Sequence, residues 1–387
     1  MKPWIGFTPE AGPDLTPRAT ATEAHPIVNI DPRQRDRRFT NRLEFRGAYR
    51  NNGFIIPAVL NMRASTMDSR LLLHIGANKT GSSAVQNFLG VNAPALRELG
   101  YLVPDRLLGI SDRVTGEHVF AFQDMFNKSN RAGLESKLRA LVKSDAKAVL
   151  VSAENLSNGT NFQFFNKLLQ GIDCKVVLYI RRQDELLTSS WQQWYSKGEL
   201  DINAWLILAL QQYGQWLRCI DGWEQVVGVG NVIVRVFQRS DLKNADVIDD
   251  FLGVAGIEAP EGGFVRTSEL INPSYSDLIT QLVSGSKFIF ANAHDNDFYK
   301  MVERLTGDHY INKNRRVSLI TPQQRDKIIE YYRLQNEAVC RRFFPNRPQL
   351  FESVDHSKYH YLTREEFSRR QLEFLASLIF AMYKKQS

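Results

Sequence analysis

The stretch LLLHIGANKTGSSAVQNFL (71–89) decides the fold that we predict for this 387-residue chain. It runs from an apolar strand at 71–76, through a turn that contains Gly76 and Gly81, into an amphipathic helix at 82–90. The N-terminus of a helix carries unpaired N–H groups and a partial positive charge. A strand, a glycine-containing turn and a helix in this order therefore predict an anion site, with the anion resting on backbone donors.

Side chains of the turn add further donors to this expected site. Lys79 contributes a full positive charge, and the neighbouring hydroxyl groups belong to Thr80, Ser82 and Ser83. The turn is not a Walker A loop, because the lysine of GxxxxGK[ST] follows the second glycine, whereas Lys79 precedes Gly81. An ordinary ATPase is therefore disfavoured, and a nucleotide kinase or another NTPase stays an alternative.

Short apolar runs alternate with longer amphipathic segments from residue 70 onward, which is typical of βαβ units around a parallel sheet. Further strands are predicted for AVLVSA (148–153), VVLYIR (176–181) and VIVRVF (232–237). Further helices are predicted at 94–99, 131–143, 184–196, 202–227, 322–343 and 364–384. We therefore predict an α/β protein with a P-loop-like three-layer fold, in which helices flank a central parallel sheet, and a helical C-terminal portion.

The segment HIGANKTGSSAVQ (74–86) resembles the 5′-phosphosulfate loop of sulfotransferases that use 3′-phosphoadenosine-5′-phosphosulfate (PAPS). The likeness is to the bacterial carbohydrate-type family, whose loop opens HIGxxKTGTTxxQ. GSS stands here for the more frequent GTT, and Asn78 stands where histidine is frequent, but no donor type is lost. INPSYSDLI (271–279) and ITPQQRDKIIEYYRLQN (320–336) resemble later parts of that family. The resemblance implies a PAPS donor, no metal, and a 5′-phosphosulfate site formed by Lys79, Thr80, Gly81, Ser82 and Ser83.

A PAPS-binding protein needs a second cationic site, because the donor carries a separate phosphate on its ribose 3′ position. Arg181 stands at the end of the predicted strand 176–181, and Ser189 follows eight residues later. This pair resembles the family's 3′-phosphate motif, and a planar guanidinium suits a dianion. Arg182 and Ser190 keep the same spacing, so the sequence does not decide which of the two Arg and Ser pairs binds the 3′-phosphate. Ligands of open α/β sheets bind at the carboxyl ends of the strands, where both expected sites lie.

Sulfuryl transfer to a hydroxyl requires a base that removes the acceptor proton. Glu154 follows the predicted strand 148–153 in VSAENLS, and SAEN resembles the SxE element of the same family. His118 is the alternative base, because imidazole titrates near neutrality. His74 lies inside a strand and is interpreted as structural. Lys79 would stabilise the negative charge that develops on the leaving oxygen.

Aromatic and amide side chains follow the expected 3′-phosphate site. We expect one or two rings to reach the site and most of them to pack in the core. These residues are Trp191, Gln192, Gln193, Trp194 and Tyr195. The resemblance implies a carbohydrate or glycolipid acceptor, and the sequence does not indicate which one.

The composition is that of a globular protein, with 43% apolar and 24% charged residues. Cys174, Cys219 and Cys340 form no CxxC or Cys/His spacing, which indicates neither a disulfide framework nor a zinc site and favours a cytoplasmic location. No stretch approaches the roughly 20 apolar residues of a membrane span, so stable membrane insertion is not expected.

The first 66 residues differ from the remainder. They hold seven of the fourteen prolines, the arginine-rich run DPRQRDRRF (31–39), and four of the seven net positive charges. We predict a poorly ordered extension at 1–66 and a sulfotransferase domain at 67–387. A non-catalytic module that binds polyanions through the extension stays an alternative, although the mildly basic domain itself indicates no nucleic-acid partner. The sequence carries no signal for an oligomeric state.

Overall fold

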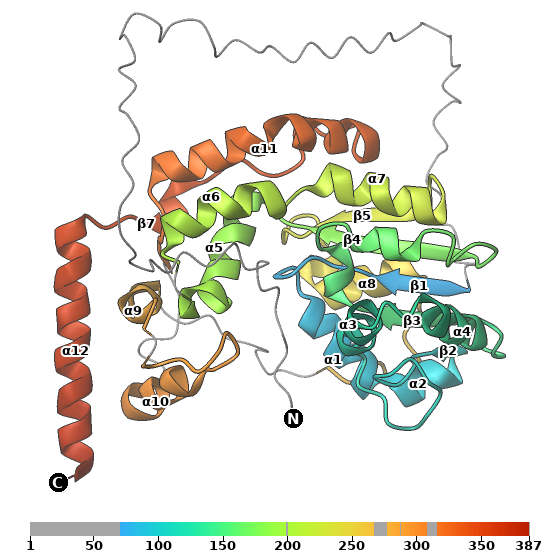
Figure 1. Ribbon diagram of the computed structural model, residues 1–387, viewed down its shortest axis with the longest axis horizontal. Helices are drawn as coiled ribbons and strands as arrows, with labels where there is room; N and C mark the ends of the chain where they lie inside the picture. Colours follow the sequence, from blue (N-terminus) through green and yellow to red (C-terminus); the bar gives the residue numbers. More distant parts are fainter. Residues whose placement is uncertain (1–69, 199, 267–276, 287, 308–315, 387) are drawn as a thin grey trace, which may run out of the picture. The chain divides into compact units, whose positions relative to one another are not determined.

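A computed structural model describes residues 70–386, apart from residues 199, 267–276, 287 and 308–315 (Figure 1). The extension predicted at 1–66 lies outside the described residues, as does most of the segment 271–279. The boundary predicted at residue 67 stays a prediction for the same reason.

The central sheet has five parallel strands in the order β2-β3-β1-β4-β5. Its strands are β1 (Leu71–His74), β2 (Tyr101–Leu102), β3 (Ala148–Ser152), β4 (Cys174–Ile180) and β5 (Val232–Val236). The four strands predicted from apolar runs are confirmed, whereas β2 was not predicted because two residues show no periodicity. Strand β1 lies between β3 and β4, so the segments that follow these three strands leave the sheet at one edge.

Helices cover both faces of this sheet, as Figure 1 shows. They are α1 (Ser82–Val91), α2 (Ala93–Glu98), α3 (Val119–Asn127), α4 (Arg131–Val142), α5 (Gln183–Gln193), α6 (Ile202–Gln212), α7 (Trp216–Val227), α8 (Val247–Ala255), α9 (Asp277–Val283), α10 (Asp297–Thr306), α11 (Pro322–Phe343) and α12 (Arg364–Gln386). Leu71 and Leu73 of β1 pack in one apolar core with α3, α4 and α7, while Leu72 packs in a second core with α1 and α8. Alternate side chains of a strand point to opposite faces, and the predicted three-layer α/β fold is thereby confirmed.

The single helix predicted at 202–227 is wrong, because the chain forms two helices there. Helix α6 ends before Tyr213, whose backbone is extended, and α7 begins at Trp216. Between them Gly214 has a φ of 67°, in the left-handed region that glycine adopts without strain. A Cβ atom at Gly214 would also lie 2.7 Å from Cγ of Gln183, so the break is fixed by packing against α5.

The C-terminal portion is mostly helical, as predicted. Helix α11 begins with a capping box between Thr321 and Gln324 and packs against α5 and α7. Strands β6 (Arg316–Val317) and β7 (Tyr359–His360) form a separate parallel pair, and α9, α10 and α12 share an apolar cluster. None of the helices that the structure describes is both long and apolar enough to cross a membrane.

Candidate functional site

The loop after β1 continues the direction of the strand and then turns sharply into α1. The N–H groups of Ile75 and Ala77 donate to carbonyl groups of β4, at 2.9 and 3.1 Å. Lys79 (φ 66°) and Gly81 (φ 79°) are both in the left-handed region. This conformation is costly for lysine, and such strain concentrates at functional sites.

The hydroxyl groups of the loop have two different environments. The Thr80 hydroxyl is buried and donates to the Ala77 carbonyl at 2.5 Å, and the Ser82 hydroxyl donates to the Gly76 carbonyl at 3.1 Å. These two side chains therefore hold the loop together. The Ser83 side chain is exposed at the start of α1, where no side chain of the described residues caps the helix. The backbone N–H groups at this helix start and Ser83 are thus the donors available to an anion.

Arg181 lies against this loop. Its Nη1 donates to the Lys79 carbonyl at 2.9 Å, and its Nε donates to Oε2 of Glu185 at 3.0 Å. The guanidinium thus contacts the lysine whose backbone is left-handed, and it supports the turn in that conformation. Ser189 is nearly buried in α5, and its hydroxyl donates to the Glu185 carbonyl at 2.6 Å.

Arg182 contacts a different set of groups. Its side chain pairs with the carboxylate groups of Asp184 and Glu185, at 2.7 and 3.2 Å, and also donates to the Tyr359 hydroxyl. Asp184 is fully buried and forms a second ion pair with Arg325 of α11. Arg181, rather than Arg182, is therefore the arginine that the fold brings to the Lys79 loop.

Glu154 begins a short 3-10 helix, Glu154–Ser157, directly after β3. Its Oε2 accepts a hydrogen bond from Nε2 of Gln86, at 2.5 Å. Burial raises the pKa of Glu154 above its ordinary value, and the Gln86 hydrogen bond offsets part of that rise. Glu154 is thus partly buried beside α1, the helix that the anion loop opens.

His118 is fully buried at the start of α3, away from solvent. The Ser152 N–H donates to its Nδ1 at 3.1 Å, and its Nε2 donates to the Pro104 carbonyl at 3.1 Å. Burial lowers the pKa of this imidazole, so it is neutral and both ring nitrogens are engaged. His118 therefore holds the ends of β3 and of the 104–118 segment together, which favours Glu154 as the candidate base.

His74 and Ser152 connect the two motifs that follow β1 and β3. Nδ1 of His74 lies 2.8 Å from the Ser152 hydroxyl, and burial lowers the pKa of His74 to about 3. A Cβ atom at Gly76 would lie 2.6 Å from Nε2 of His74 and 3.1 Å from Oγ of Ser82. Gly76 therefore has to be glycine for the loop to pass over the histidine, and His74 is structural, as interpreted from the sequence.

The aromatic side chains that follow Arg181 and Arg182 differ in their burial and contacts. Trp191 is fully buried among α5, α6 and α11, and Tyr195 packs against Trp205 and Tyr213. Trp194 is partly exposed, and its ring centroid lies 5.9 Å from Nζ of Lys79. A ring at this position can stack on a planar ligand that enters beside the lysine.

The comparisons with known proteins give limited similarity. No family model matches the chain. An uncharacterized protein of Archaeoglobus fulgidus is 27% identical over 209 residues, which cover 54% of this chain and 56% of that protein. The chain thus spans about half the length of this relative. A sulfotransferase from Alicyclobacillus acidocaldarius has a similar structure with a TM-score of 0.35 and 15% sequence identity, over 54% of this chain and 88% of that one.

Two hydrogen-bonded contacts in this site were not predicted from the sequence, namely that of Gln86 with Glu154 and that of His74 with Ser152. Gln86 lies at the end of the segment HIGANKTGSSAVQ. It follows Ser82 by four residues, so both side chains lie on one face of α1. Ser152 is the last residue of β3, and its hydroxyl lies beside His74 of the neighbouring strand β1. Helical spacing was thus a signal that could have pointed to Gln86, whereas the partner of Ser152 depends on the pairing of the strands.

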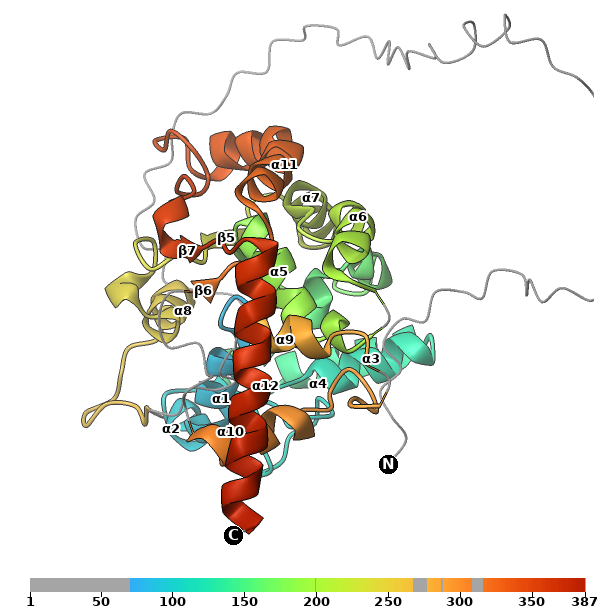
Figure 2. The ribbon, with the colours of Figure 1, turned by 90° about the vertical axis from the view of Figure 1, so that its left-hand side faces the viewer.

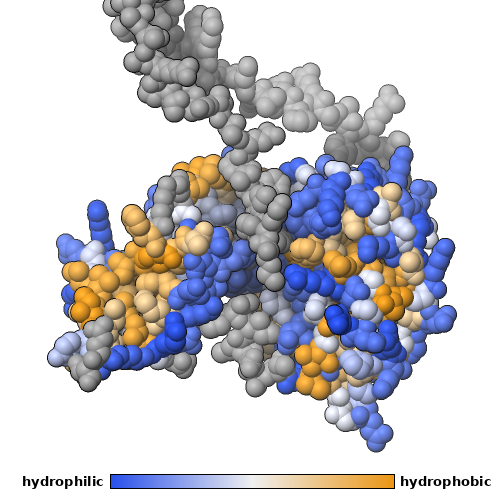
Figure 3. Space-filling model, turned by 60° about the horizontal axis from the view of Figure 1, so that its bottom comes forward, coloured by the Kyte–Doolittle hydropathy of each residue, from blue (hydrophilic) through white to orange (hydrophobic). Residues whose placement is uncertain are grey.

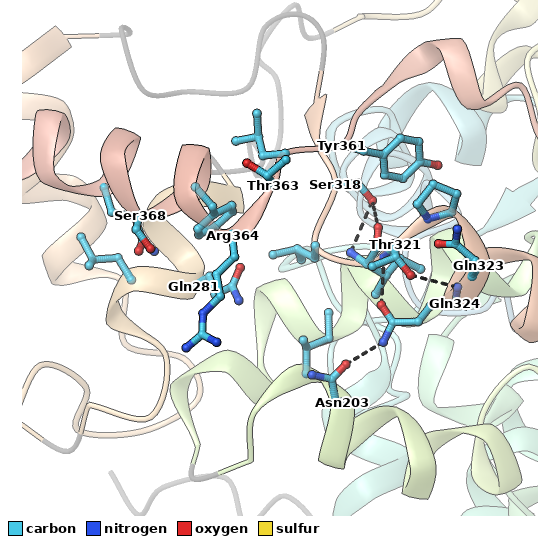
Figure 4. Close-up of a pocket in the computed structure, with 18 residues that line it drawn as sticks. Asn203, Gln281, Ser318, Thr321, Gln323, Gln324, Tyr361, Thr363, Arg364 and Ser368 are labelled. Atoms are coloured by element: carbon cyan, nitrogen blue, oxygen red, sulfur yellow. Dashed lines mark hydrogen bonds between the residues drawn. The ribbon is translucent and has the colours of Figure 1, made fainter.

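A separate groove of about 730 Å³ lies between α6, α9, the start of α11 and the β7–α12 connection (Figure 4). Amide and hydroxyl side chains line much of it, and Gln324 donates to Asn203 at 2.7 Å. Lys79, Arg181 and Glu154 are not part of its lining. The groove is therefore distinct from the anion site at the edge of the sheet.

Proposed function

We propose that this chain is a sulfotransferase that transfers a sulfuryl group from PAPS to a hydroxyl group of a carbohydrate or glycolipid. The hydrogen bond from Arg181 to the Lys79 carbonyl carries this proposal, because it joins the two expected anion sites. The 5′-phosphosulfate and the 3′-phosphate of PAPS are attached to one ribose. A protein that binds both groups therefore needs two cationic side chains that lie close together.

The residues present fit such a donor. Backbone N–H groups at the start of α1, with Ser83 and Lys79, would hold the 5′-phosphosulfate. A guanidinium has five N–H donors, and the contacts of Arg181 with Lys79 and Glu185 engage three of them. Among the contacts of the described residues, two donors of Arg181 are left for the 3′-phosphate. The Ser189 hydroxyl would join them after rotation away from the helix backbone.

The chemistry assigns separate tasks to Glu154 and Lys79. Glu154 takes the proton of the acceptor hydroxyl as its oxygen bonds to sulfur, while the bond between sulfur and the bridging phosphate oxygen breaks. Lys79 offsets the negative charge that grows on that bridging oxygen. The products are a sulfate ester and 3′-phosphoadenosine-5′-phosphate (PAP), and the proton passes from Glu154 to solvent.

A thermal-shift titration tests the proposed donor. We expect PAP to raise the melting temperature, whereas ATP with Mg²⁺ does not, because a ligand that binds the folded state stabilises it. In the Arg181→Ala variant, PAP should bind about tenfold to a hundredfold more weakly, since charge-assisted hydrogen bonds to one phosphate are lost. Binding of 5′-AMP, which lacks the 3′-phosphate, should weaken by a smaller factor, because only the support that Arg181 gives to the Lys79 turn is lost.

Arg218→Ala is the matched control, because Arg218 is an exposed arginine of α7. It should leave PAP binding unchanged. Stabilisation by ATP with Mg²⁺ but not by PAP would overturn the proposed donor and favour a nucleotide kinase or another NTPase.

The hydrogen bond from Gln86 to Glu154 predicts a shift in the pH profile of transfer. Because this bond stabilises the ionised carboxylate, the Gln86→Met variant should have a Glu154 pKa that is raised further. The base must be ionised to accept a proton, so the acidic limb of the rate profile should move to higher pH. Rates of transfer from radiolabelled PAPS, measured across pH, check this. A uniform loss at every pH would argue against this positioning role.

A further inference from the structure

Two elements near the C-terminus make different kinds of contact. Helix α12 packs against α9 and α10 through an apolar cluster, and Figure 3 shows apolar residues gathered over this part of the molecule at the left of the view. Strand β7 instead makes polar contacts with α5, the helix that follows the Arg181 and Arg182 pair. In Figure 1 and Figure 2, β7 lies below α11 and near α5. The polar contacts of β7 therefore lie close to the candidate anion site.

Tyr359 of β7 makes these contacts. Its hydroxyl donates to Oε1 of Glu185 at 3.2 Å and accepts from Nη2 of Arg182 at 3.2 Å. Its ring lies against the guanidinium of Arg325, whose Cζ is 3.7 Å from the ring centroid. Burial and the nearby Glu185 carboxylate raise the pKa of Tyr359 to about 12. The hydroxyl therefore keeps its proton near neutral pH and stays a donor.

The two oxygen atoms of the Glu185 carboxylate have different partners. Oε1 accepts from Tyr359 and from Arg182, whereas Oε2 accepts from Nε of Arg181 at 3.0 Å. Burial alone would raise the pKa of Glu185, but the charges of the two arginines and the hydrogen bonds from Arg181 and Tyr359 outweigh it and lower the pKa. The carboxylate is thus ionised, and it is held from both sides.

Arg181 connects this carboxylate to the Lys79 turn. Its Nη1 donates to the Lys79 carbonyl at 2.9 Å, while its Nε and Nη2 face Oε2 of Glu185. A glutamate side chain has many rotamers, and that of Glu185 is 33% exposed, so its orientation depends on the partners of each oxygen. A donor that fixes Oε1 therefore also fixes the oxygen that faces Arg181.

We propose that Tyr359 is a positioning residue of the donor site, which orients Glu185 so that Glu185 holds Arg181 against the Lys79 turn. The inference rests on the proposed function, because that function assigns Arg181 to the 3′-phosphate. An arginine that is held in place before the ligand binds loses less rotamer freedom on binding. The effect of Tyr359 is partial, since Arg182 also contacts Oε1. A C-terminal strand thus supports a site formed by the segments after β1 and β4.

Titration calorimetry of the full chain with PAP tests the inference. Tyr359→Phe removes the hydroxyl but keeps the ring that lies against Arg325. PAP should bind this variant about threefold to tenfold more weakly, the loss typical of one hydrogen bond. In the Arg181→Ala background, the same substitution should change PAP affinity by less than about twofold, because the residue through which Tyr359 acts is absent. A merely structural role would weaken binding by the same factor in both backgrounds.

Tyr331→Phe is the matched control, because Tyr331 of α11 is 53% exposed and loses the same hydroxyl. It should leave PAP affinity unchanged, and unfolding curves should show that all variants are folded. The inference alone is overturned if the parent chain binds PAP and Tyr359→Phe binds it equally well, or loses the same factor with and without Arg181. A parent chain that binds no PAP would overturn the proposed function, and this inference with it.

Discussion

Replacing Lys79 with alanine is expected to slow sulfuryl transfer by about a hundredfold to a thousandfold, the loss typical of removing one charge-stabilising donor from an active site. Lys79 stands at the turn between β1 and α1, where its carbonyl accepts from Arg181. A cation fixed there binds the leaving oxygen more tightly as its charge develops, so the effect falls on turnover. The PAP affinity should also fall, by a smaller factor.

The rate of label transfer from radiolabelled PAPS into the acceptor fraction of a cell extract measures this effect. Lys167→Ala is a close control, because Lys167 is also a lysine in the left-handed region, with a φ of 63°, and it is exposed. Both variants therefore place alanine in a left-handed backbone conformation, so any destabilisation from that conformation affects both. Wild-type turnover in Lys79→Ala would remove the lysine from the proposed chemistry.

Most of the sheet could be predicted because its central strands are buried on both faces and form continuous apolar runs, as in β1 and β3. The break at Gly214 could not, because the amphipathic pattern of 202–227 is nearly continuous. That break depends on Gln183, which is distant in sequence but packs beside Gly214. Edge strand β2 depends likewise on pairing with β3.

Some parts of the candidate site could likewise be predicted from the sequence, whereas others depend on contacts between distant residues. Lys79 lies in the loop after β1 and Arg181 directly follows β4, so parallel strand order predicts that they share an edge of the sheet. The preference for Arg181 over Arg182 depends instead on the ion pairs of Asp184, one of which comes from Arg325 in α11. The different surroundings of His118 and Glu154 also arise from tertiary contacts. Local sequence patterns do not predict contacts between residues that lie far apart in the chain.

Replacing Glu154 with glutamine is expected to slow transfer by about a hundredfold to ten-thousandfold, the range for loss of a general base. Glutamine keeps the shape and the acceptor oxygen that meets Gln86, but it cannot accept the proton of the acceptor hydroxyl. PAP affinity should be nearly unchanged, because Glu154 is not among the proposed donor contacts. Label transfer and PAP titration together check this, and full activity in the variant would require another base.

The same substitution should raise thermal stability near neutral pH, which separates loss of chemistry from loss of fold. Burial raises the pKa of Glu154 in the folded chain, so the folded state holds its proton more tightly than the unfolded state. The stability that this protonated carboxyl contributes is present below the ordinary carboxyl pKa and is lost as pH rises through the folded value. Glutamine stays neutral throughout, so Glu154→Gln should melt above the parent near neutral pH, with the difference shrinking below pH about 4. If the parent chain melted higher than the variant at neutral pH, the ionised carboxylate of Glu154 would be stabilised in the folded state. Glu154 would then be a weaker base, and its proposed role in accepting the proton would lose support.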